Sequence, residues 1–311
     1  MLEKFNFERM LTTLNYLQAF VIGCCVGSFL NVVIYRFPIN LSIVKPRSFC
    51  PNCKIKLTWR ENIPLISWII QRGMCLSCNI KISKRYPFVE LFTGCLFVFF
   101  LRSSPSLYIS SSNQFFNVIF SWIFLSLLIC ISMIDIDQFW IPQGLINFGF
   151  LFGFLGLIFI DVFNNRSIDF NLIFKTLGGS FMAFFIFESF RKFVKYLYKK
   201  DAIGKGDSKL IAMMALWLGP LGIILSVSIS YIFAALFCLA GLSLKIFKLK
   251  QAIPFAPFLS LGGITVWFLG NNFLIKKSHT FRTFFIIRWL NRMVFRKRFF
   301  NRKNTTYLII G

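Results

Sequence analysis

Histidine is almost absent from this chain of 311 residues, which contains one, His279. A Ser-His-Asp or Cys-His hydrolase needs an imidazole base, and a zinc protease of the H-E-x-x-H type needs two imidazole ligands. A single histidine in a basic stretch builds none of these sites. Acid–base chemistry in this chain therefore has to use carboxylates.

Carboxylates are scarce as well. Asp and Glu number 11 against 35 Lys and Arg, which gives a formal net charge of +24. Such an excess can signal nucleic-acid binding, but 57% of the residues are hydrophobic and only 15% are charged, as in membrane proteins. We therefore assign the positive charge to cytoplasmic loops and to contact with anionic membrane lipid, and we expect no nucleic-acid partner.

Apolar runs suited to a bilayer fill most of the chain, and we predict an all-α polytopic membrane protein with about eight transmembrane helices. The predicted spans are residues 16–35, 87–101, 115–134, 143–160, 171–190, 210–219, 221–244 and 255–275. Gly23, Gly27 and Ser28 in the first span suit close helix packing. The predicted regions are an N-terminal segment with the first helix (1–36), a polar loop (37–86), a membrane core (87–275) and a basic tail (276–311).

The polar loop contains two Cys-x-x-Cys pairs. Cys50, Cys53, Cys75 and Cys78 form the pattern C-x2-C-x21-C-x2-C, which is typical of a tetrahedral zinc site. Two disulfides are the alternative, but nine Lys and Arg residues place the loop in the reducing cytosol by the positive-inside rule. We predict a structural zinc, because four cysteine ligands leave no open coordination position.

Basic residues also predict the topology. They place the cysteine loop and the segments 135–142, 191–209 and 245–251 on the cytoplasmic side. Eight spans would then put the C-terminus outside, yet ten Lys and Arg residues follow residue 275. Either the tail lies on a membrane surface as an amphipathic helix, or the number of spans differs by one.

One aspartate stands where a basic loop meets an apolar run. The stretch G-K-G-D-S-K at 204–209 places Asp207 in the first turn of a helix, where the helix dipole favours an anion. Asp135 and Asp137 end another span at the same predicted boundary. Two carboxylates at one depth on two helices can act as an aspartic protease, one ionised and one protonated. The alternative is that these are boundary carboxylates solvated by lipid headgroups.

Together these segments resemble the bacterial type IV prepilin peptidases, membrane aspartic proteases of the G-x-G-D class. The likeness covers about residues 20–270. It is carried by the cysteine pairs, the Ile-Asp turn that ends at Pro142, and five motifs: G-S-F-L-N-V-V-I-Y-R at 27–36, E-N-I-P at 61–64, R-Y-P-F-V-E at 85–90, G-K-G-D-S-K at 204–209 and P-F-A-P-F at 254–258.

The resemblance implies cleavage of the basic leader from prepilins and pseudopilins of type IV pili and type II secretion, at the cytoplasmic face of the bacterial inner membrane. In many members it also implies N-methylation of the new terminus with S-adenosylmethionine. The family motifs assign the catalytic pair to Asp135, rather than Asp137, and Asp207. They link methyl transfer to the position of Gly73, and the family lysine that follows it is Met74 here.

The resemblance leads to one further expectation and leaves alternatives open. We expect Lys209 to orient the carboxylate of Asp207. A peptidase without methyltransferase activity and a non-enzymatic component of pilin assembly both stay possible from the sequence. A presenilin-like intramembrane protease is disfavoured, because the chain has no Pro-Ala-Leu motif.

Overall fold

The computed structural model describes residues 2–102, 114–165, 170–199, 204–248 and 251–270, so the basic tail at 276–311 lies outside the described residues. The helices are α1 (Leu2–Arg36), α2 (Ile66–Ile70), α3 (Arg85–Arg102), α4 (Gln114–Gln138), α5 (Gln143–Asn165), α6 (Phe170–Tyr198), α7 (Lys205–Ser243) and α8 (Ala256–Leu269), with a 3-10 turn at Arg60–Asn62. Extended segments of the described chain form only two isolated β-bridges, both in the cysteine loop. The predicted all-α class is confirmed.

Four segments of the described helices are long and apolar enough to cross a membrane. They are Thr13–Arg36, Phe115–Gln138, Ile173–Leu197 and Lys205–Ser243. Two shorter apolar helices, Gln143–Phe159 and Ala256–Leu269, accompany them. The chain is therefore an integral membrane protein, as its composition predicts.

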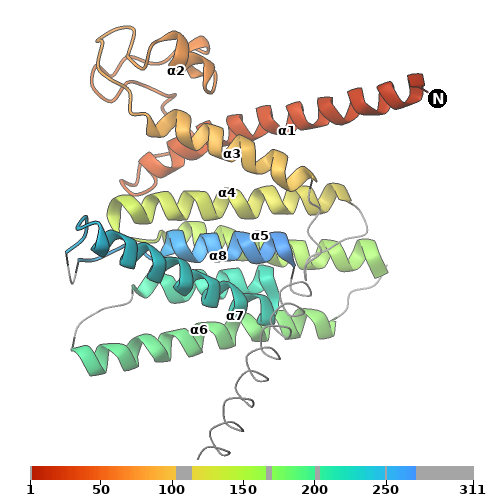
Figure 1. Cartoon of the computed structure of the whole chain (residues 1–311), viewed down its shortest axis with the longest axis vertical. Helices are drawn as coiled ribbons and strands as arrows, with labels where there is room; N and C mark the ends of the chain where they lie inside the picture. Colours follow the sequence, from red (N-terminus) through yellow and green to blue (C-terminus); the bar gives the residue numbers. More distant parts are fainter. Residues whose placement is uncertain (1, 103–113, 166–169, 200–203, 249–250, 271–311) are drawn as a thin grey trace, which may run out of the picture.

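Helix α7 consists of two limbs. Gly219 leaves the helical conformation, with φ 73° and ψ 173°, and Pro220 follows it. Met214 and Ser226 both lie within 4 Å of the point where a Cβ on Gly263 would stand. A straight helix would separate them by about 18 Å, since twelve residues rise about 1.5 Å each. The chain therefore reverses at Gly219, and the limbs run side by side (Figure 1).

The first limb (205–218) and the second limb (220–243) correspond to two separate predicted spans. With α7 counted as two limbs, the described residues contain eight helical segments of 14 residues or more, although only four helices, with α7 counted as one, are long and apolar enough to cross a membrane. Figure 1 shows the cysteine loop, here residues 37–84, at the same end of the bundle as the end of α4 and the starts of α7 and α8.

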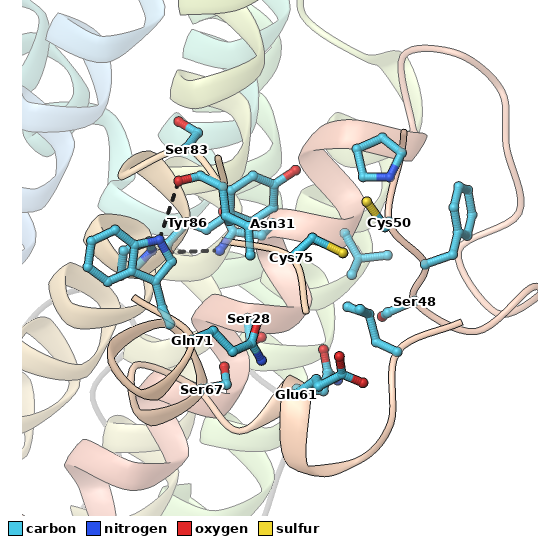
Figure 2. Close-up of a pocket in the computed structure, with 18 of the residues that line it drawn as sticks. Ser28, Asn31, Ser48, Cys50, Glu61, Ser67, Gln71, Cys75, Ser83 and Tyr86 are labelled. Carbon is cyan, nitrogen blue, oxygen red and sulfur yellow. Dashed lines mark hydrogen bonds between the residues drawn. The ribbon is translucent and has the colours of Figure 1, made fainter. Parts of the chain in front are cut away.

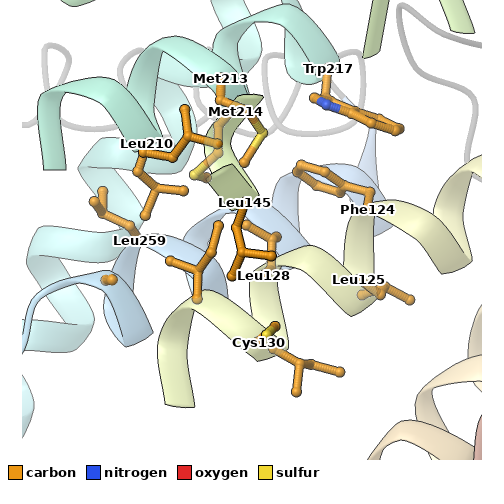
Figure 3. Packing of buried hydrophobic residues seen from close by; sticks show 14 of the residues in the cluster. Phe124, Leu125, Leu128, Cys130, Leu145, Leu210, Met213, Met214, Trp217 and Leu259 are labelled. Carbon is orange, nitrogen blue, oxygen red and sulfur yellow. The ribbon is translucent and has the colours of Figure 1, made fainter. Parts of the chain in front are cut away.

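The core forms between α4, α5, the first limb of α7 and α8 (Figure 3). Trp217 stacks on Phe124, with ring centroids 5.0 Å apart, and donates its indole N–H to the carbonyl of Gly149 at 2.9 Å. Every residue from 210 to 219 is buried. Protein rather than lipid therefore surrounds the helix that begins at the G-K-G-D stretch.

Glycines allow α1 to pack closely on α3. A Cβ on Gly23 would stand 2.7 Å from the Cα of Gly94, and one on Gly27 would stand 2.8 Å from the Cα of Glu90. Both distances are shorter than real Cβ contacts, so larger residues would force the helices apart. The predicted role of Gly23 and Gly27 in helix packing is confirmed.

Candidate active site and metal centre

Asp135 lies in the last turn of α4. The helix continues to Gln138, so the predicted turn at 135–142 begins later than expected. The side chain is 6% exposed, and its Oδ2 accepts the N–H of Ala256 at 3.0 Å. Ala256 begins α8, and a helix N-terminus favours a negative charge. The fold therefore buries the carboxylate of Asp135 and supplies a backbone N–H as its hydrogen-bond donor.

Asp207 lies in the first turn of α7, as predicted. It is 6% exposed, and its Oδ2 accepts the N–H of Gly204 at 3.2 Å. Gly206 permits this arrangement, because a Cβ there would stand 2.8 Å from the Cβ of Ile141. The glycine therefore lets the start of α7 approach the segment that follows α4.

The two aspartates form a pair. Their carboxylates lie close enough for their charges to interact, although the residues come from different helices. Each carboxylate accepts a backbone N–H at the start of a helix. Two carboxylates brought together from different helices are the arrangement that an aspartic protease uses. The arrangement can activate a water molecule and polarise a carbonyl group.

Asp137 has a different environment. Its carboxylate forms an ion pair with Arg85 at the start of α3, and the same guanidinium donates to the carbonyl of Met133 at 3.1 Å. The side chains of Arg85 and Asp137 are 31% and 37% exposed. Asp137 therefore connects α4 to α3, while Asp135 is buried and bonded to the start of α8.

The predicted contact of Lys209 with Asp207 is not present; Lys209 bonds to another helix instead. Its Nζ donates to Oε1 of Gln143 at 2.6 Å, and no ion pair to Asp207 occurs in the part of the chain that the structure describes. Lys209 thus connects the starts of α7 and α5 rather than orienting the carboxylate of Asp207.

The four cysteines of the loop converge on one point. The Sγ atoms of Cys50, Cys53, Cys75 and Cys78 all lie within 4.8 Å of one another. Cys50 Sγ and Cys78 Sγ are 3.8 Å apart, and a tetrahedral site with Zn–S bonds of roughly 2.3 Å has edges of about 3.8 Å. The N–H of Ile80 and the side chain of Asn52 lower the pKa of the Cys78 thiol to about 6, while burial and the neighbouring thiols raise the pKa of Cys53 to about 11. The low value favours at Cys78 the thiolate that a metal requires. The cluster fits a structural metal such as zinc.

The burial pattern supports that assignment. From residue 37 to residue 84, all of which the structure describes, Cys50 and Cys75 are the only buried apolar side chains. Eleven of the loop's larger apolar side chains, among them Trp59 and Ile70, are exposed instead. A loop without an apolar core needs a cross-link to hold one conformation.

Polar side chains hold the cysteine loop against the membrane helices, and the sequence alone did not indicate these contacts. Arg36 is buried at the end of α1 and donates to the carbonyls of Ser42 at 3.0 Å and Pro46 at 2.8 Å. Glu90 of α3 accepts the N–H of Leu65 at 2.8 Å. The motifs at 27–36 and 85–90 contain Arg36 and Glu90, but spacing alone does not indicate what they bind.

Gly73 lies beside a cavity that neither Asp135 nor Asp207 lines. Its φ is +68°, and a Cβ would stand 2.9 Å from the indole of Trp68. Trp68 lines a cavity of about 370 Å³ between the loop, α1 and α3 (Figure 2). A larger residue at position 73 would therefore displace the wall of this cavity.

Comparison with known proteins matches two separate regions of the chain to two family models. Residues 21–103 match the family described as "Bacterial Peptidase A24 N-terminal domain", and residues 122–239 match the "Type IV leader peptidase family". The "Type 4 prepilin-like proteins leader peptide-processing enzyme" of Escherichia coli O78:H11 (strain H10407 / ETEC) is 34% identical over 267 residues, which are 79% of this chain and 91% of that protein. The chain belongs to the type IV leader peptidase family.

Other relatives of this leader peptidase agree. The "Prepilin leader peptidase/N-methyltransferase" of Legionella pneumophila is 31% identical over 287 residues, which are 83% of this chain and 93% of that protein. The protein of the same name from Myxococcus xanthus (strain DK1622) is 38% identical over 215 residues, which are 67% of this chain but 58% of that longer relative. No solved structure matches the chain. The family resemblance seen in the motifs is confirmed.

The family regions assign the structural features to two parts of the leader peptidase. The N-terminal region at 21–103 contains the cysteine cluster and the cavity, and the region at 122–239 contains Asp135 and Asp207. The Arg85–Asp137 ion pair joins these two regions directly.

Proposed function

We propose that this leader peptidase is an aspartic endopeptidase of the bacterial inner membrane that removes the leader peptide from type IV prepilins and pseudopilins. The observation that carries the proposal is the burial of Asp135 and Asp207 on two helices that meet at one end of the bundle, each with a backbone N–H as donor. The names of the relatives support prepilins as the substrates.

Asp135 and Asp207 share one proton in the proposed reaction. The ionised carboxylate takes a proton from water as the water oxygen bonds to the scissile carbonyl carbon, and the protonated carboxyl donates to the carbonyl oxygen. Collapse of the tetrahedral intermediate breaks the C–N bond, and the leaving nitrogen takes a proton from the pair. The N–H groups of Ala256 and Gly204 hold the two carboxylates in place.

Cleavage takes place at the cytoplasmic face in this proposal. The carboxylate pair lies at the end of the bundle that carries the basic cysteine loop, and the positive-inside rule assigns such an end to the cytoplasm. The same basic residues would contact anionic lipid headgroups. The charge excess is accounted for in this way, without a nucleic-acid partner.

Zinc is the proposed metal of the cysteine cluster. Cys50, Cys53, Cys75 and Cys78 would hold it, and it would supply a cross-link rather than a Lewis acid, since four thiolates fill its coordination sphere. The proposal includes a second reaction, N-methylation of the new terminus with S-adenosylmethionine. The printed names of several relatives include N-methyltransferase, and Gly73 is the cofactor-site residue that the motif suggests.

Cleavage of a purified prepilin, followed by mass spectrometry of the product terminus, tests the peptidase function. Asp135→Asn and Asp207→Asn should each lower the cleavage rate by about 10²–10⁴-fold, the usual contribution of acid–base catalysis. Both variants should still insert into the membrane and keep their metal. A variant that cleaves at near the wild-type rate would refute the pair, and pilus assembly supported by both inactive variants would favour the non-enzymatic alternative.

A further inference from the structure

Helix α6 carries an ion pair inside its membrane-spanning segment, Ile173–Leu197. The guanidinium of Arg191 donates to both carboxylate oxygens of Glu188, and its Nε lies 2.9 Å from Oε2. The side chains of Arg191 and Glu188 are 9% and 20% exposed, compared with 31% and 37% in the Arg85–Asp137 pair. Charged groups are costly to bury in a membrane helix, so this pair is a candidate for a functional role.

Glu188 also contacts the start of α7. The hydroxyl of Ser208 donates to Oε2 of Glu188 at 3.1 Å. Ser208 is 2% exposed and directly follows Asp207 in the first turn of α7. Its hydroxyl also lies 3.2 Å from the carbonyl oxygen of Lys205, but the hydroxyl has one proton, and a charged carboxylate is the stronger acceptor. The ion pair of α6 therefore holds the turn that contains Asp207.

The first turn of α7 is held from two directions. Gly206 packs against Ile141 in the segment after α4, and Ser208 bonds to α6. Successive residues of an α-helix are about 100° apart, since each turn contains roughly 3.6 residues, so Gly206 and Ser208 lie on different sides of the turn. Asp207 stands between them in the sequence. Loss of the Ser208 contact would let the carboxylate of Asp207 move relative to Asp135.

Helices α6 and α7 also contact each other farther from Asp207. The hydroxyl of Ser180 donates to the carbonyl of Ala212 at 2.5 Å, and a Cβ on Gly179 would stand 2.8 Å from Cγ of Pro220. These contacts use small, uncharged groups, whereas the contact beside Asp207 uses an ion pair. Packing of the two helices alone does not explain a buried charge at that position.

We propose that Glu188 and Arg191 are positioning residues for Asp207, which they hold in place through the hydroxyl of Ser208. Arg191 fixes the carboxylate of Glu188 by two hydrogen bonds, and Glu188 in turn fixes Ser208. All three act through the position of Asp207 rather than by contact with the reacting atoms. The inference rests on the proposed function, and it goes beyond that function by assigning part of the site geometry to α6, which carries neither Asp135 nor Asp207.

Ser208→Ala tests this positioning role without leaving a buried charge unpaired, because Glu188 keeps its bonds to Arg191. The variant should lower kcat for prepilin cleavage about tenfold and change KM less than about twofold, since it disturbs the geometry of the acid–base pair and not substrate binding. Glu188→Gln keeps an oxygen that can accept the Ser208 hydroxyl but loses the charge, so it should lower kcat only about threefold. The double variant should match Ser208→Ala within about twofold, because Glu188 acts through Ser208.

Ser180→Ala is the matched control. It also removes a buried hydroxyl that joins α6 to α7, but the partner of that hydroxyl, Ala212, lies a helical turn beyond Asp207. The kcat of this control should stay within about twofold of the wild-type value, although its melting temperature should fall about as far as that of Ser208→Ala. The proposal is overturned if Ser180→Ala lowers kcat as much as Ser208→Ala, because general helix packing then explains the effect. An unchanged kcat in Ser208→Ala also overturns it.

Hydrogen exchange of the purified protein separates this proposal from the peptidase function, because it needs no substrate. The backbone N–H of Asp207 donates to the carbonyl of Gly204 at 3.3 Å, within the turn that Ser208 holds. Amide exchange at residues 207–211 should be about tenfold faster in Ser208→Ala than in the wild type, and unchanged in Ser180→Ala. Equal exchange in Ser208→Ala and the wild type overturns the proposal. A wild-type protein that shows the expected difference but cuts no prepilin refutes the peptidase instead and leaves the contact of α6 with the Asp207 turn supported.

Discussion

Replacement of Cys50 and Cys78 together by serine should release the metal and unfold the cysteine loop. A structural zinc contributes about 10–16 kcal/mol in small zinc domains. The entire stability of a typical domain is about 5–15 kcal/mol. In residues 37–84, all described, only Cys50 and Cys75 are buried apolar side chains, so the loop has no core to compensate for the loss.

Metal content and limited trypsin digestion measure this effect. The wild-type protein should hold one zinc per chain, and the double variant should hold less than a tenth of that. The loop contains exposed trypsin sites at Arg47, Lys54, Lys56 and Arg60. Trypsin requires local unfolding of its substrate, so these bonds should be cut much faster in the variant. The digestion pattern of the fragment that contains α4 to α8 should change little, since only Phe37 and Ile43 of the loop pack against its core.

Cys25→Ser with Cys95→Ser is the matched control, because both residues are exposed and lie outside the cluster. This control should keep one zinc and the slow digestion pattern. Full zinc retention by the Cys50 and Cys78 double variant would refute the four-thiolate site. Unchanged digestion after zinc loss would refute the argument that the metal replaces a core.

Two further predictions concern the membrane core. Asp137→Asn should slow cleavage less than about fivefold, because an exposed ion pair contributes about 0.2–1 kcal/mol, and a loss as large as that of Asp135→Asn would contradict the separation of the two aspartates. Gly262→Ala should destabilise the protein by about 1–3 kcal/mol in thermal unfolding, because its Cβ would stand 2.3 Å from the carbonyl oxygen of Ser226. Gly178→Ala, with no atom within 4 Å of the added Cβ, is the control, and equal melting of the two variants would contradict the packing.

Local patterns predict most of the helices and the cysteine cluster, because both depend on residues close in sequence. The reversal at Gly219 follows from a Gly-Pro pair between two apolar runs. The position of Asp207 in a first helical turn follows from the glycines before it. These features need no knowledge of which helices are neighbours.

The environment of each carboxylate depends on distant segments and could not be predicted from residue patterns. Asp135 and Asp137 end the same apolar run, and the structure distinguishes them by the contact of Asp137 with Arg85, 52 positions earlier. The donor to Asp135 is the backbone N–H of Ala256, 121 positions later. Nearly every residue has a backbone N–H, so the sequence does not show which one donates. Lys209 was misjudged for the same reason, since its partner Gln143 lies on another helix.

The reversal of α7 also constrains how the protein enters the membrane during synthesis. The first limb is about 21 Å long at roughly 1.5 Å per residue, which is shorter than the ~30 Å hydrocarbon core. It cannot remain inserted alone, so both limbs enter as one hairpin with no hydrophilic segment to translocate. Asp207 reaches its final depth only with the second limb, and Asp135 receives its donor only after α8 has been made. In the proposed mechanism, the carboxylate pair is therefore complete only after almost all of the membrane core has left the ribosome.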